Sequence, residues 1–376
     1  MAKKQPVLKK LLDIRTWMNQ QLIERAEEIT GFLVALLARE HVLMVGPPGT
    51  AKSMLANFGC RSIDGAKFFA WLMTKHSVPE ELFGQVSVKQ LENDIYERVT
   101  TKKLPEATIA FLDEIWKSNS AILNALLTII NERKFINGTR EISVPLKTVV
   151  AASNEWPEAE ELTALFDRFA LKYVVRYISD DNFIEFLNLK LNSKNGKVAT
   201  CPLILDDELT EAQAEVDMVV FPQEILLKLK DLRIKLRADH NIILSERKWG
   251  QCLSLVQAYA YLNGHTEAEL EDLLILKNAV WTTEKQMPDA MSVVYEMSNP
   301  AAKVALDFSN EIQSVMVNAV LSTQDGCTEA IEKIKAIGRR LIDAQQQYPT
   351  DDLKKLSDKV MQYKKQLSSS LVDALR

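Results

Sequence analysis

Several residue types are scarce in this sequence of 376 residues, and each scarcity excludes a class of protein. Only 12 glycines and 12 prolines occur, which argues against a disordered chain and against an all-β plan. The four cysteines lie far apart and form no Cys-x-x-Cys pair. Their scatter excludes a disulfide framework or a zinc site of that kind, and predicts reduced thiols in a cytoplasmic protein. These cysteines are Cys60, Cys201, Cys252 and Cys327.

Long apolar runs and an excess of charge are also missing. No run approaches the roughly 18 residues that a membrane span needs, and the first residues lack the apolar core of a signal peptide. We therefore expect no membrane insertion. The formal net charge of −5 gives no general attraction to nucleic acid or to an anionic membrane. With 47% hydrophobic and 26% charged residues, the composition is ordinary for a globular chain of two or three domains.

What the sequence does contain is a glycine-rich string directly after an apolar run at 41–45, which predicts a buried strand. In such a loop, the backbone N–H groups and the start of the next helix bind phosphates. Lys52 would reach the β- and γ-phosphates, and the Ser53 hydroxyl would bind Mg²⁺. The residues predicted to hold the nucleotide are Gly46, Pro47, Pro48, Gly49, Thr50, Ala51, Lys52, Ser53 and Met54.

A second string, Phe111-Leu-Asp-Glu-Ile115, belongs to the end of a strand predicted at 108–112. Asp113 would hold the Mg²⁺ shell, and Glu114 would polarise the attacking water. The alternative is that the first string is only a tight turn and that the two acidic residues start a solvated helix. A turn has no need of a Lys-Ser pair, so the two strings together predict a site for ATP and Mg²⁺.

One position departs from the usual loop. The strict pattern has glycine where this chain has Ala51. Alanine fits there if its backbone φ is negative, and we expect a negative value.

The order of predicted elements indicates an α/β fold followed by helices. Strands are predicted at 41–45, 68–72, 108–112, 148–153 and 172–178, and helices within 8–38, 52–59 and 118–133. This alternation, with nearly continuous apolar strands, is typical of a parallel sheet covered by helices on both faces. Small hairpins are predicted within 85–103 and at 135–142, the second around Asn137-Gly138.

The strand signals stop near residue 181, and the chain is divided accordingly. The expected parts are an α/β nucleotide-binding domain at 1–185, a connector with little core at 186–220, a compact helical module at 221–286 and a helical region of unknown role at 287–376. The last helix carries an apolar seam, which either packs on a neighbouring helix of the same chain or forms a coiled-coil or partner contact. The seam consists of Leu353, Leu356, Val360, Tyr363, Leu367 and Leu371.

Three further residues stand where they could complete the site. Asn154 closes the strand after the acidic one, where its amide could orient the attacking water. Arg168 lies on a short helix from which it could reach into a neighbouring subunit. Arg247 opens a helix of the helical module, and its guanidinium could fold back onto the γ-phosphate of its own subunit. The three match the sensor, arginine-finger and second-sensor positions of AAA+ ATPases.

Each of the three also has a simpler interpretation. Asn154 could cap the following turn, and Arg168 could pair with a nearby carboxylate. Arg247 could be an ordinary surface charge, with Lys248 as the actual contact to the nucleotide. The carboxylates near Arg168 in the sequence are Asp167 and Glu161.

The combined motifs resemble the MoxR family of AAA+ ATPases and, within it, the branch called regulatory ATPase variant A. That branch also has the Ser-x-Arg-x-Trp pattern of Ser245–Trp249 and is similar to this chain at Ala51. The resemblance spans roughly residues 20–285 and does not cover 287–376. Its strings include Gly46-Pro-Pro-Gly-Thr-Ala-Lys-Ser53, Glu81-Leu-Phe-Gly84, Phe111-Leu-Asp-Glu-Ile-Trp-Lys117, Leu126-Leu-Thr-Ile-Ile-Asn-Glu-Arg-Lys-Phe-Ile-Asn-Gly138 and Ala151-Ala-Ser-Asn-Glu155.

The resemblance implies an AAA+ core, a lid formed by 221–286, and an ATP-hydrolysing ring, usually a hexamer, with the nucleotide between subunits. It also implies chaperone-like remodelling or maturation of protein clients, often with a von Willebrand factor A-domain partner. A nucleic-acid-associated AAA+ ATPase is the main alternative, which the acidic balance and the lack of a basic arm weaken. An ATP-binding switch or scaffold with little turnover is another, and Glu114, Asn154 and Arg168 argue against it.

Overall fold

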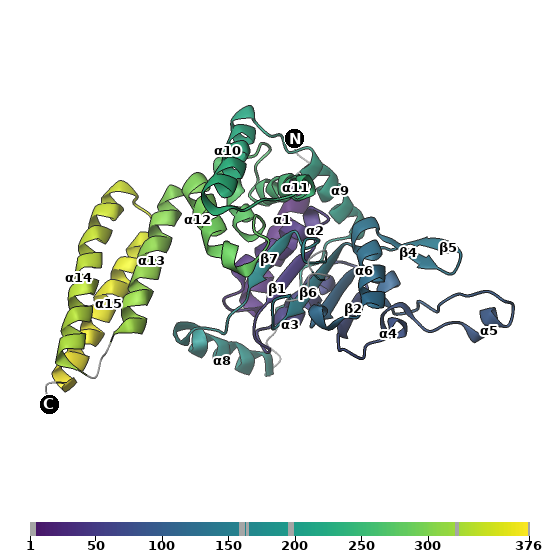
Figure 1. Ribbon diagram of the computed structural model, residues 1–376, viewed down its shortest axis with the longest axis horizontal. Helices are drawn as coiled ribbons and strands as arrows, with labels where there is room; N and C mark the ends of the chain where they lie inside the picture. Colours follow the sequence, from purple (N-terminus) through teal and green to yellow (C-terminus); the bar gives the residue numbers. More distant parts are fainter. Residues whose placement is uncertain (1–4, 158–161, 163–164, 195–198, 320–322, 375–376) are drawn as a thin grey trace. The chain divides into compact units, whose positions relative to one another are not determined.

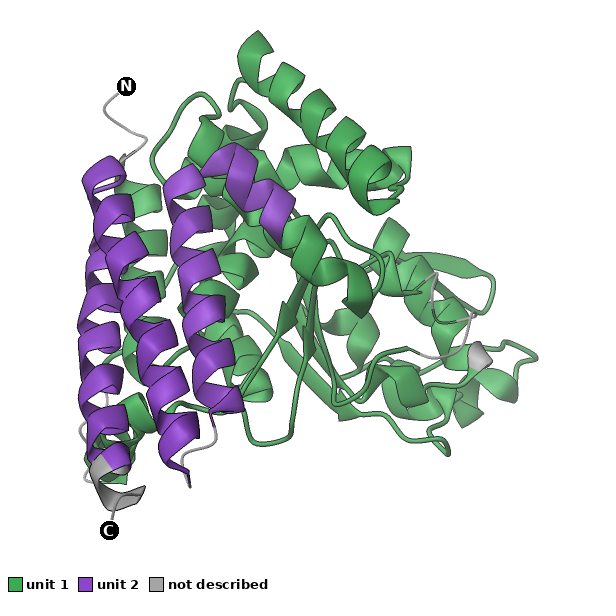
Figure 2. Cartoon of the chain, turned by 60° about the vertical axis from the view of Figure 1, so that its left-hand side comes forward, with its two compact units in different colours: residues 1–291 green, residues 292–376 purple. Residues whose placement is uncertain are grey.

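The structure is a computed structural model that describes residues 5–157, 162, 165–194, 199–319 and 323–374. The chain forms two compact units, Met1–Met291 and Ser292–Arg376, which are green and purple in Figure 2. The first unit holds the sheet and the phosphate loop. Among the described residues, no helix combines the length and the apolarity that crossing a membrane requires.

A five-stranded parallel sheet forms the centre of the first unit (Figure 1). Its strands follow the order β2 (Phe68–Leu72), β3 (Ile109–Asp113), β6 (Thr148–Ser153), β1 (Val42–Val45) and β7 (Leu171–Val174). Because all pairs are parallel, the carboxyl ends of the strands lie at one edge. The loops that leave the neighbouring strands β3, β6 and β1 therefore meet there, which is where open α/β sheets bind ligands.

Helices pack on this sheet, as the sequence predicts for an α/β fold. The predicted helical stretch 8–38 is two helices, α1 (Gln5–Gln21) and α2 (Ala26–Leu37), separated by a short turn. The largely buried α2 packs against β1, β6 and β7, and α3 (Lys52–Arg61) packs against β2 and β3. A further helix, α6 (Ser120–Glu132), is capped by the side chain of Asn119.

Two segments extend from the sheet at one end of the unit (Figure 1). The predicted hairpin at 135–142 is confirmed as β4 (Lys134–Asn137) and β5 (Arg140–Ser143), but its turn is Gly138-Thr139. The hairpin predicted within 85–103 is confirmed only as a short antiparallel pairing, in which Val86 bridges Arg98 and the N–H groups of Ser87 and Val99 donate to Glu97 at 2.7 Å and to Gln85 at 2.8 Å. The connection between the paired residues contains a short helix, α5 (Val88–Leu91). On its other side, Arg98 exchanges both backbone groups with the side-chain amide of Asn137, at 2.7 and 3.0 Å.

The expectation of a connector with little core at 186–220 is wrong for its second half. The helix α8 (Asp180–Lys194) buries none of its side chains, but α9 (Asp206–Asp217) buries Leu209, Ala212, Gln213 and Val216. It packs against α1, α2 and α11 (Glu246–Leu262) and so belongs to the core.

The helical module consists of α10 (Gln223–His240), α11 (Glu246–Leu262) and the 3-10 segment η3 (Leu270–Asn278). It is joined to the sheet by buried contacts. On β7, the ammonium of the buried Lys172 donates to the carbonyl of Trp281 at 2.7 Å and lies over the Trp281 ring at 4.9 Å. These two contacts attach the module to β7. Burial holds the pKa of Lys172 well below its usual value.

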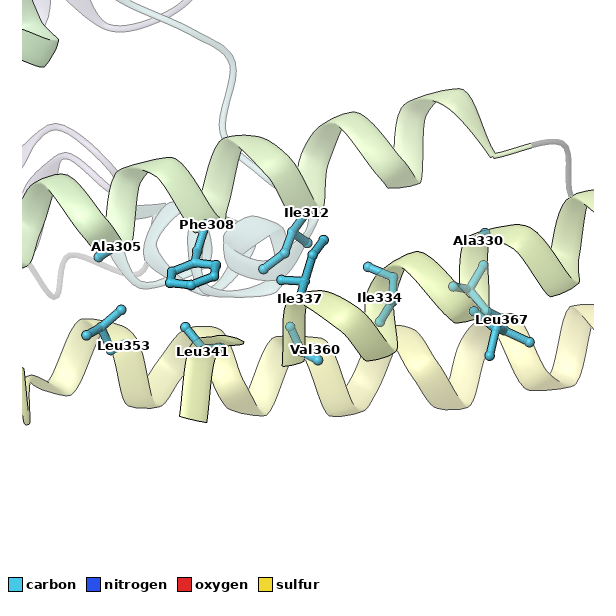
Figure 3. Packing of buried hydrophobic residues seen from close by; sticks show 11 residues of the cluster. Ala305, Phe308, Ile312, Ala330, Ile334, Ile337, Leu341, Leu353, Val360 and Leu367 are labelled. Atoms are coloured by element: carbon cyan, nitrogen blue, oxygen red, sulfur yellow. The ribbon is translucent and has the colours of Figure 1, made fainter. Parts of the chain in front are cut away.

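The second unit begins within α12 (Met287–Ser298) and continues as α13 (Pro300–Asn318), α14 (Gln324–Gln347) and α15 (Asp351–Ala374). These last three helices share an apolar core, part of which is drawn in Figure 3. The seam of α15 packs into that core, so the interpretation as a contact within the same chain is confirmed. Its most buried members are Leu353, Val360 and Leu367.

Candidate nucleotide site

The phosphate loop lies between β1 and α3 and depends on close backbone approach. A Cβ atom on Gly46 would stand 2.1 Å from the carbonyl oxygen of Val175, so only glycine fits there. Gly49 has a φ of +80°, which glycine adopts without strain. The prediction of a negative φ for Ala51 is wrong, because its φ is +67°. The loop therefore holds an alanine in the left-handed region, at a cost of about 1–2 kcal/mol.

Lys52 folds back over the loop. Its ammonium donates to the carbonyl oxygens of Gly46 at 2.6 Å and Pro47 at 2.9 Å. Burial lowers the pKa of Lys52, and the nearby carboxylates of Asp113 and Glu114 oppose that shift. When phosphates bind, their charged oxygens can replace the two carbonyl oxygens as acceptors of the Lys52 ammonium, because they accept more strongly from a cation.

Asp113 and Glu114 meet Asn154 at the ends of two neighbouring strands. The Asn154 amide donates to Glu114 Oε1 at 2.5 Å. The turn after β6 is instead held by Ser153, whose hydroxyl accepts from the backbone of Glu155 at 3.1 Å. The interpretation of Asn154 as a turn cap is therefore wrong. Burial raises the pKa of Asp113.

The oxygens of this cluster suit a hard cation. The hydroxyl of Ser53 and the carboxylate of Asp113 belong to one cavity, and oxygen donors of this kind are what Mg²⁺ takes while keeping positions for water and phosphate. Asp113 also accepts from the backbone N–H of Glu114 at 3.1 Å, which fixes the carboxylate. The donor set fits the metal that the sequence predicts.

These groups line a cavity of about 590 Å³, which we call the phosphate-loop cavity. Its lining includes loop residues 48–54 with Asp113, Glu114 and Asn154. Other lining residues come from the turn between α1 and α2 and from the segment after β7. Gly46 and Pro47 do not line the cavity and act instead through the carbonyls that hold Lys52.

Arg25 also lines this cavity, and the sequence analysis missed it. Its guanidinium is buried and donates from Nε to the carbonyl of Thr50 at 3.1 Å and from Nη2 to that of Arg176 at 2.6 Å. It therefore ties the phosphate loop to the end of β7. A lone arginine before a helix carries no sequence signal for this role, because the contacts are made across 25 and 151 positions.

Arg168 and Arg247 line a different pocket, of about 640 Å³, which we call the arginine pocket. Within the described part of the chain, no ion pair joins Arg168 to Asp167, and its buried Nε has no hydrogen-bond partner. Glu161 lies outside the described residues. Arg247 is exposed in the first turn of α11 and does not line the phosphate-loop cavity. Its expected contact with the γ-phosphate of its own chain stays a prediction.

Lys248 has a structural role. Its ammonium is buried and donates to the carbonyls of Phe169 at 3.0 Å and Ala170 at 3.2 Å. Burial lowers the pKa of Lys248. The alternative that it contacts the nucleotide is wrong, because its side chain is used to attach α11 to the segment that carries Arg168.

Glu40, His41 and Gln251 also line the arginine pocket. Desolvation raises the pKa of Glu40 to about 7, against the opposing charges of Lys248 and Arg133, and Gln251 donates to it at 2.8 Å. Burial and the Arg133 charge lower the pKa of His41 to about 3, and its Nδ1 accepts from the backbone of Val149 at 2.9 Å.

Comparisons with known proteins cover most of the chain. A family model described as the MoxR domain in MoxR–vWA–β-propeller ternary systems matches residues 9–214, and a model of an AAA lid domain matches residues 224–294. An uncharacterised protein of Methanocaldococcus jannaschii, MJ0079, is 39% identical over 311 residues, which are 82% of this chain and 80% of the relative. Chaperone MoxR1 of Mycobacterium tuberculosis is 30% identical over 174 residues, 45% of this chain and 43% of that one.

A solved structure from Cytophaga hutchinsonii, provisionally assigned as an ATPase, superposes with a TM-score of 0.66. It is 16% identical and covers 79% of this chain and 97% of its own, so it supports the fold alone. The MoxR model, by contrast, matches more than half of the chain and includes every element that forms the phosphate-loop cavity. The chain therefore belongs to the MoxR family of AAA+ ATPases.

Proposed function

We propose that the chain hydrolyses ATP with Mg²⁺ in a homo-oligomeric ring, in which each site is completed by the arginine pocket of the neighbouring copy. One observation carries the proposal: the groups suited to bind phosphates and to activate water share one cavity, whereas Arg168 and Arg247 share another. An arginine that stabilises the transferring phosphoryl group is needed for fast turnover, and it can be supplied by a partner.

Each residue then has a definite role. Lys52 and the loop N–H groups bind the phosphates, and Ser53 and Asp113 hold Mg²⁺, which neutralises developing charge at the phosphates. Glu114 accepts a proton from the attacking water, and Asn154 orients that carboxylate through the 2.5 Å hydrogen bond. Because Arg247 shares the pocket of Arg168, it acts in this proposal with Arg168 from the neighbouring copy.

The experiment that tests the proposal measures the ATPase rate against protein concentration, with the mass of the assembly determined with and without ATP. We expect the specific activity to climb as a ring appears, usually a hexamer in the family that the chain resembles. A constant specific activity from a monomer contradicts the shared site. Stimulation by added DNA, and not by protein concentration, would instead favour a nucleic-acid-associated ATPase.

The same ring would remodel or mature protein clients. Two observations support this: the matching family model is described from systems that contain a vWA protein, and one relative is a chaperone by name. A von Willebrand factor A-domain protein is therefore the partner we propose. The narrower branch, regulatory ATPase variant A, still rests on the Ser245–Trp249 pattern, and the cytoplasmic location rests on the scattered cysteines.

A further inference from the structure

The segment between α11 and η3 brings a histidine and two glutamates together. Nε2 of His265 lies 4.0 Å from Oε1 of Glu269 and 3.9 Å from Oε1 of Glu271, which is too long for hydrogen bonds. The three ligand atoms all lie within 4.8 Å of one another. In a tetrahedral zinc site with bonds of about 2.1 Å, ligand atoms stand about 3.4 Å apart. The two glutamate side chains are 60% and 63% exposed, so they are free to close the small remaining difference.

A buried carboxylate orients the imidazole. Asp272 is 0% exposed, and its Oδ2 lies 2.9 Å from Nδ1 of His265. Asp272 also accepts from the side-chain amide of Asn263 at 3.0 Å and from the backbone N–H of Glu269 at 2.9 Å, which hold the carboxylate in place. Because a carboxylate only accepts, Nδ1 carries a hydrogen, and the lone pair of the neutral ring is on Nε2, next to the two glutamates. Histidines that bind zinc are commonly oriented in this way, by a carboxylate behind the ring.

The backbone of this segment is held from two sides. The N–H of His265 donates to the carbonyl of Ala260, near the end of α11, at 2.9 Å. The N–H of Ala268 donates to the carbonyl of Val220 at 2.8 Å, and the N–H of Val220 donates to the carbonyl of Thr266 at 3.1 Å. The histidine is thus placed before any ligand binds, and only the two glutamate side chains have to be ordered. Such preorganisation favours binding.

We propose that His265, Glu269 and Glu271 bind a zinc ion, with Asp272 as the positioning residue behind the imidazole. An imidazole nitrogen suits zinc, whereas Mg²⁺ and Ca²⁺ prefer ligand sets made of oxygen alone. Three protein ligands leave the fourth tetrahedral position for water. Bound zinc ties the end of α11 to the start of η3 and so stabilises the helical module. The site shares no lining residue with the phosphate-loop cavity.

The experiment is a zinc titration of the full chain without nucleotide, against a coloured chelator that competes for the metal. Excess Mg²⁺ is present throughout, because it fills sites made of oxygen and competes weakly for imidazole. The test variant is the Glu269→Gln, Glu271→Gln double variant, which removes two exposed ligands. We expect the wild type to bind one more equivalent of zinc than this variant. A wild type that binds no more zinc than the variant overturns the proposal, and the cluster is then a set of ion pairs around a protonated His265.

Two further variants separate coordination from charge. Glu267→Gln removes an exposed carboxylate of the same segment that is not one of the three ligands, and it should bind zinc as the wild type does. An equal loss in Glu267→Gln would show that zinc is attracted by negative charge alone. Asp272→Asn weakens the hydrogen bond to Nδ1 and should lower the zinc affinity by roughly 10–100-fold, the usual effect of losing such a partner. Since Asp272 is buried, circular dichroism checks the fold of this variant, and the exposed glutamate pair tests the site if it misfolds.

Two readouts report on the bound metal directly. X-ray absorption at the zinc edge should show nitrogen and oxygen ligands at about 2.0–2.2 Å, with the scattering of one imidazole. Sulfur ligands at about 2.3 Å would assign the zinc to cysteines and overturn the proposal. Zinc should also raise the melting temperature of the wild type and of Glu267→Gln, because a ligand that binds the folded state stabilises it. The same rise in the double variant would contradict the site.

Discussion

The phosphate-loop cavity and the arginine pocket differ in how their charges are satisfied. In the first, the charged and polar groups partner one another: Asn154 donates to Glu114, and the charges of Asp113 and Glu114 act on Lys52. In the second, four arginines line the pocket with only two glutamates, and the buried Nε of Arg168 has no acceptor in the described chain. Glu40, one of these glutamates, has its pKa raised to about 7 and so carries only part of a charge at neutral pH.

The difference shows that the two pockets complement each other. One chain presents a loop built for anions with its catalytic carboxylate, and elsewhere presents a pocket in which four arginines outnumber two glutamates. A second copy that docks its arginine pocket on the phosphates would satisfy both. Docking would cover the arginine charges, and a covered charge without a partner is costly. Docking is therefore favourable only when phosphate is present. Assembly and nucleotide binding should therefore be coupled.

The largest effect is expected for Arg168→Ala. If this side chain completes the neighbour's site, its loss should lower turnover by about 10³-fold or more and leave ATP binding intact. Single-turnover hydrolysis and equilibrium binding measure the two quantities separately. Arg39→Ala is the matched control, because Arg39 lines the same pocket but pairs with the exposed Asp217 at 3.1 Å.

Mixing sharpens the same comparison. Subunits with Arg168→Ala should regain some activity when mixed with Glu114→Gln subunits, since some interfaces then combine an intact carboxylate with an intact arginine. If Arg168→Ala alone keeps full turnover, the pocket has no part in hydrolysis.

Glu114→Gln is expected to lower turnover by about 10²–10⁴-fold, the usual contribution of a general base. The amide keeps the shape of the side chain and its contact with Asn154, so ATP should still bind. Rapid-quench measurement of phosphate release, together with binding of labelled ATP, checks both. Glu155→Gln should behave as wild type, because Glu155 is exposed and does not line the cavity.

Lys248 and Arg247 are neighbours in sequence, yet we expect their substitutions to affect different properties. Lys248→Met leaves the carbonyls of Phe169 and Ala170 without a donor, which should cost about 1–3 kcal/mol in the free energy of unfolding. Arg247→Ala should leave the melting temperature unchanged and lower turnover instead, because the side chain is exposed. Denaturant melts and ATPase rates on both variants test this. Unchanged stability in Lys248→Met would contradict its structural role.

The sequence predicted those parts of the site that depend on local patterns. The strand ends, the phosphate loop and Asp113 with Glu114 follow from apolar runs and short motifs, and the structure places them at one edge of the sheet. The same logic identified the seam of α15, since periodicity reports which face is apolar. Local chemistry and chain order were sufficient for these features.

Features that depend on contacts between distant segments could not be predicted. Arg25 reaches the phosphate loop across 25 positions, and Asn137 takes the backbone groups of Arg98 across 39. The second of these contacts joins the segment around Arg98 to the β4–β5 hairpin. Likewise, Arg247 is exposed and Lys248 is buried, although both are basic. Neighbours in a helix point about 100° apart, so two similar side chains lie on different faces.

A pH effect distinguishes Glu40 from the other groups of the arginine pocket. Its pKa is raised to about 7 from 4.5, so the folded chain holds a proton that the unfolded chain releases between these values. The stability that depends on this proton is present below pH 4.5 and is lost as the pH rises through 7. His41 has the opposite effect, because its pKa is lowered to about 3. Its contribution to stability is present above pH 6.5 and is lost as the pH falls toward 3.

Glu40→Gln isolates the first contribution. Between pH 5 and pH 8, the wild type should lose on the order of 2 kcal/mol in the free energy of unfolding through the ionisation of Glu40. The variant cannot ionise at this position and should not show that loss. Urea melts at the two pH values measure this difference. An identical pH dependence in both proteins would show that Glu40 is not held in its protonated form by the fold.

The smallest effect concerns the strain in the phosphate loop. Ala51 has a φ of +67°, so Ala51→Gly should relieve about 1–2 kcal/mol in the folded state. Glycine also makes the unfolded chain more flexible, which lowers the free energy of unfolding by about 0.4–1 kcal/mol. The net gain should be about 0.5–1 kcal/mol.

The matched control is Ala56→Gly in α3, where the backbone is helical and the same change should cost about 1 kcal/mol. Thermal melts of both variants should move in opposite directions. A loss of stability in both variants would mean that the left-handed backbone at Ala51 stores no strain, and that alanine serves there as well as the glycine of the strict pattern.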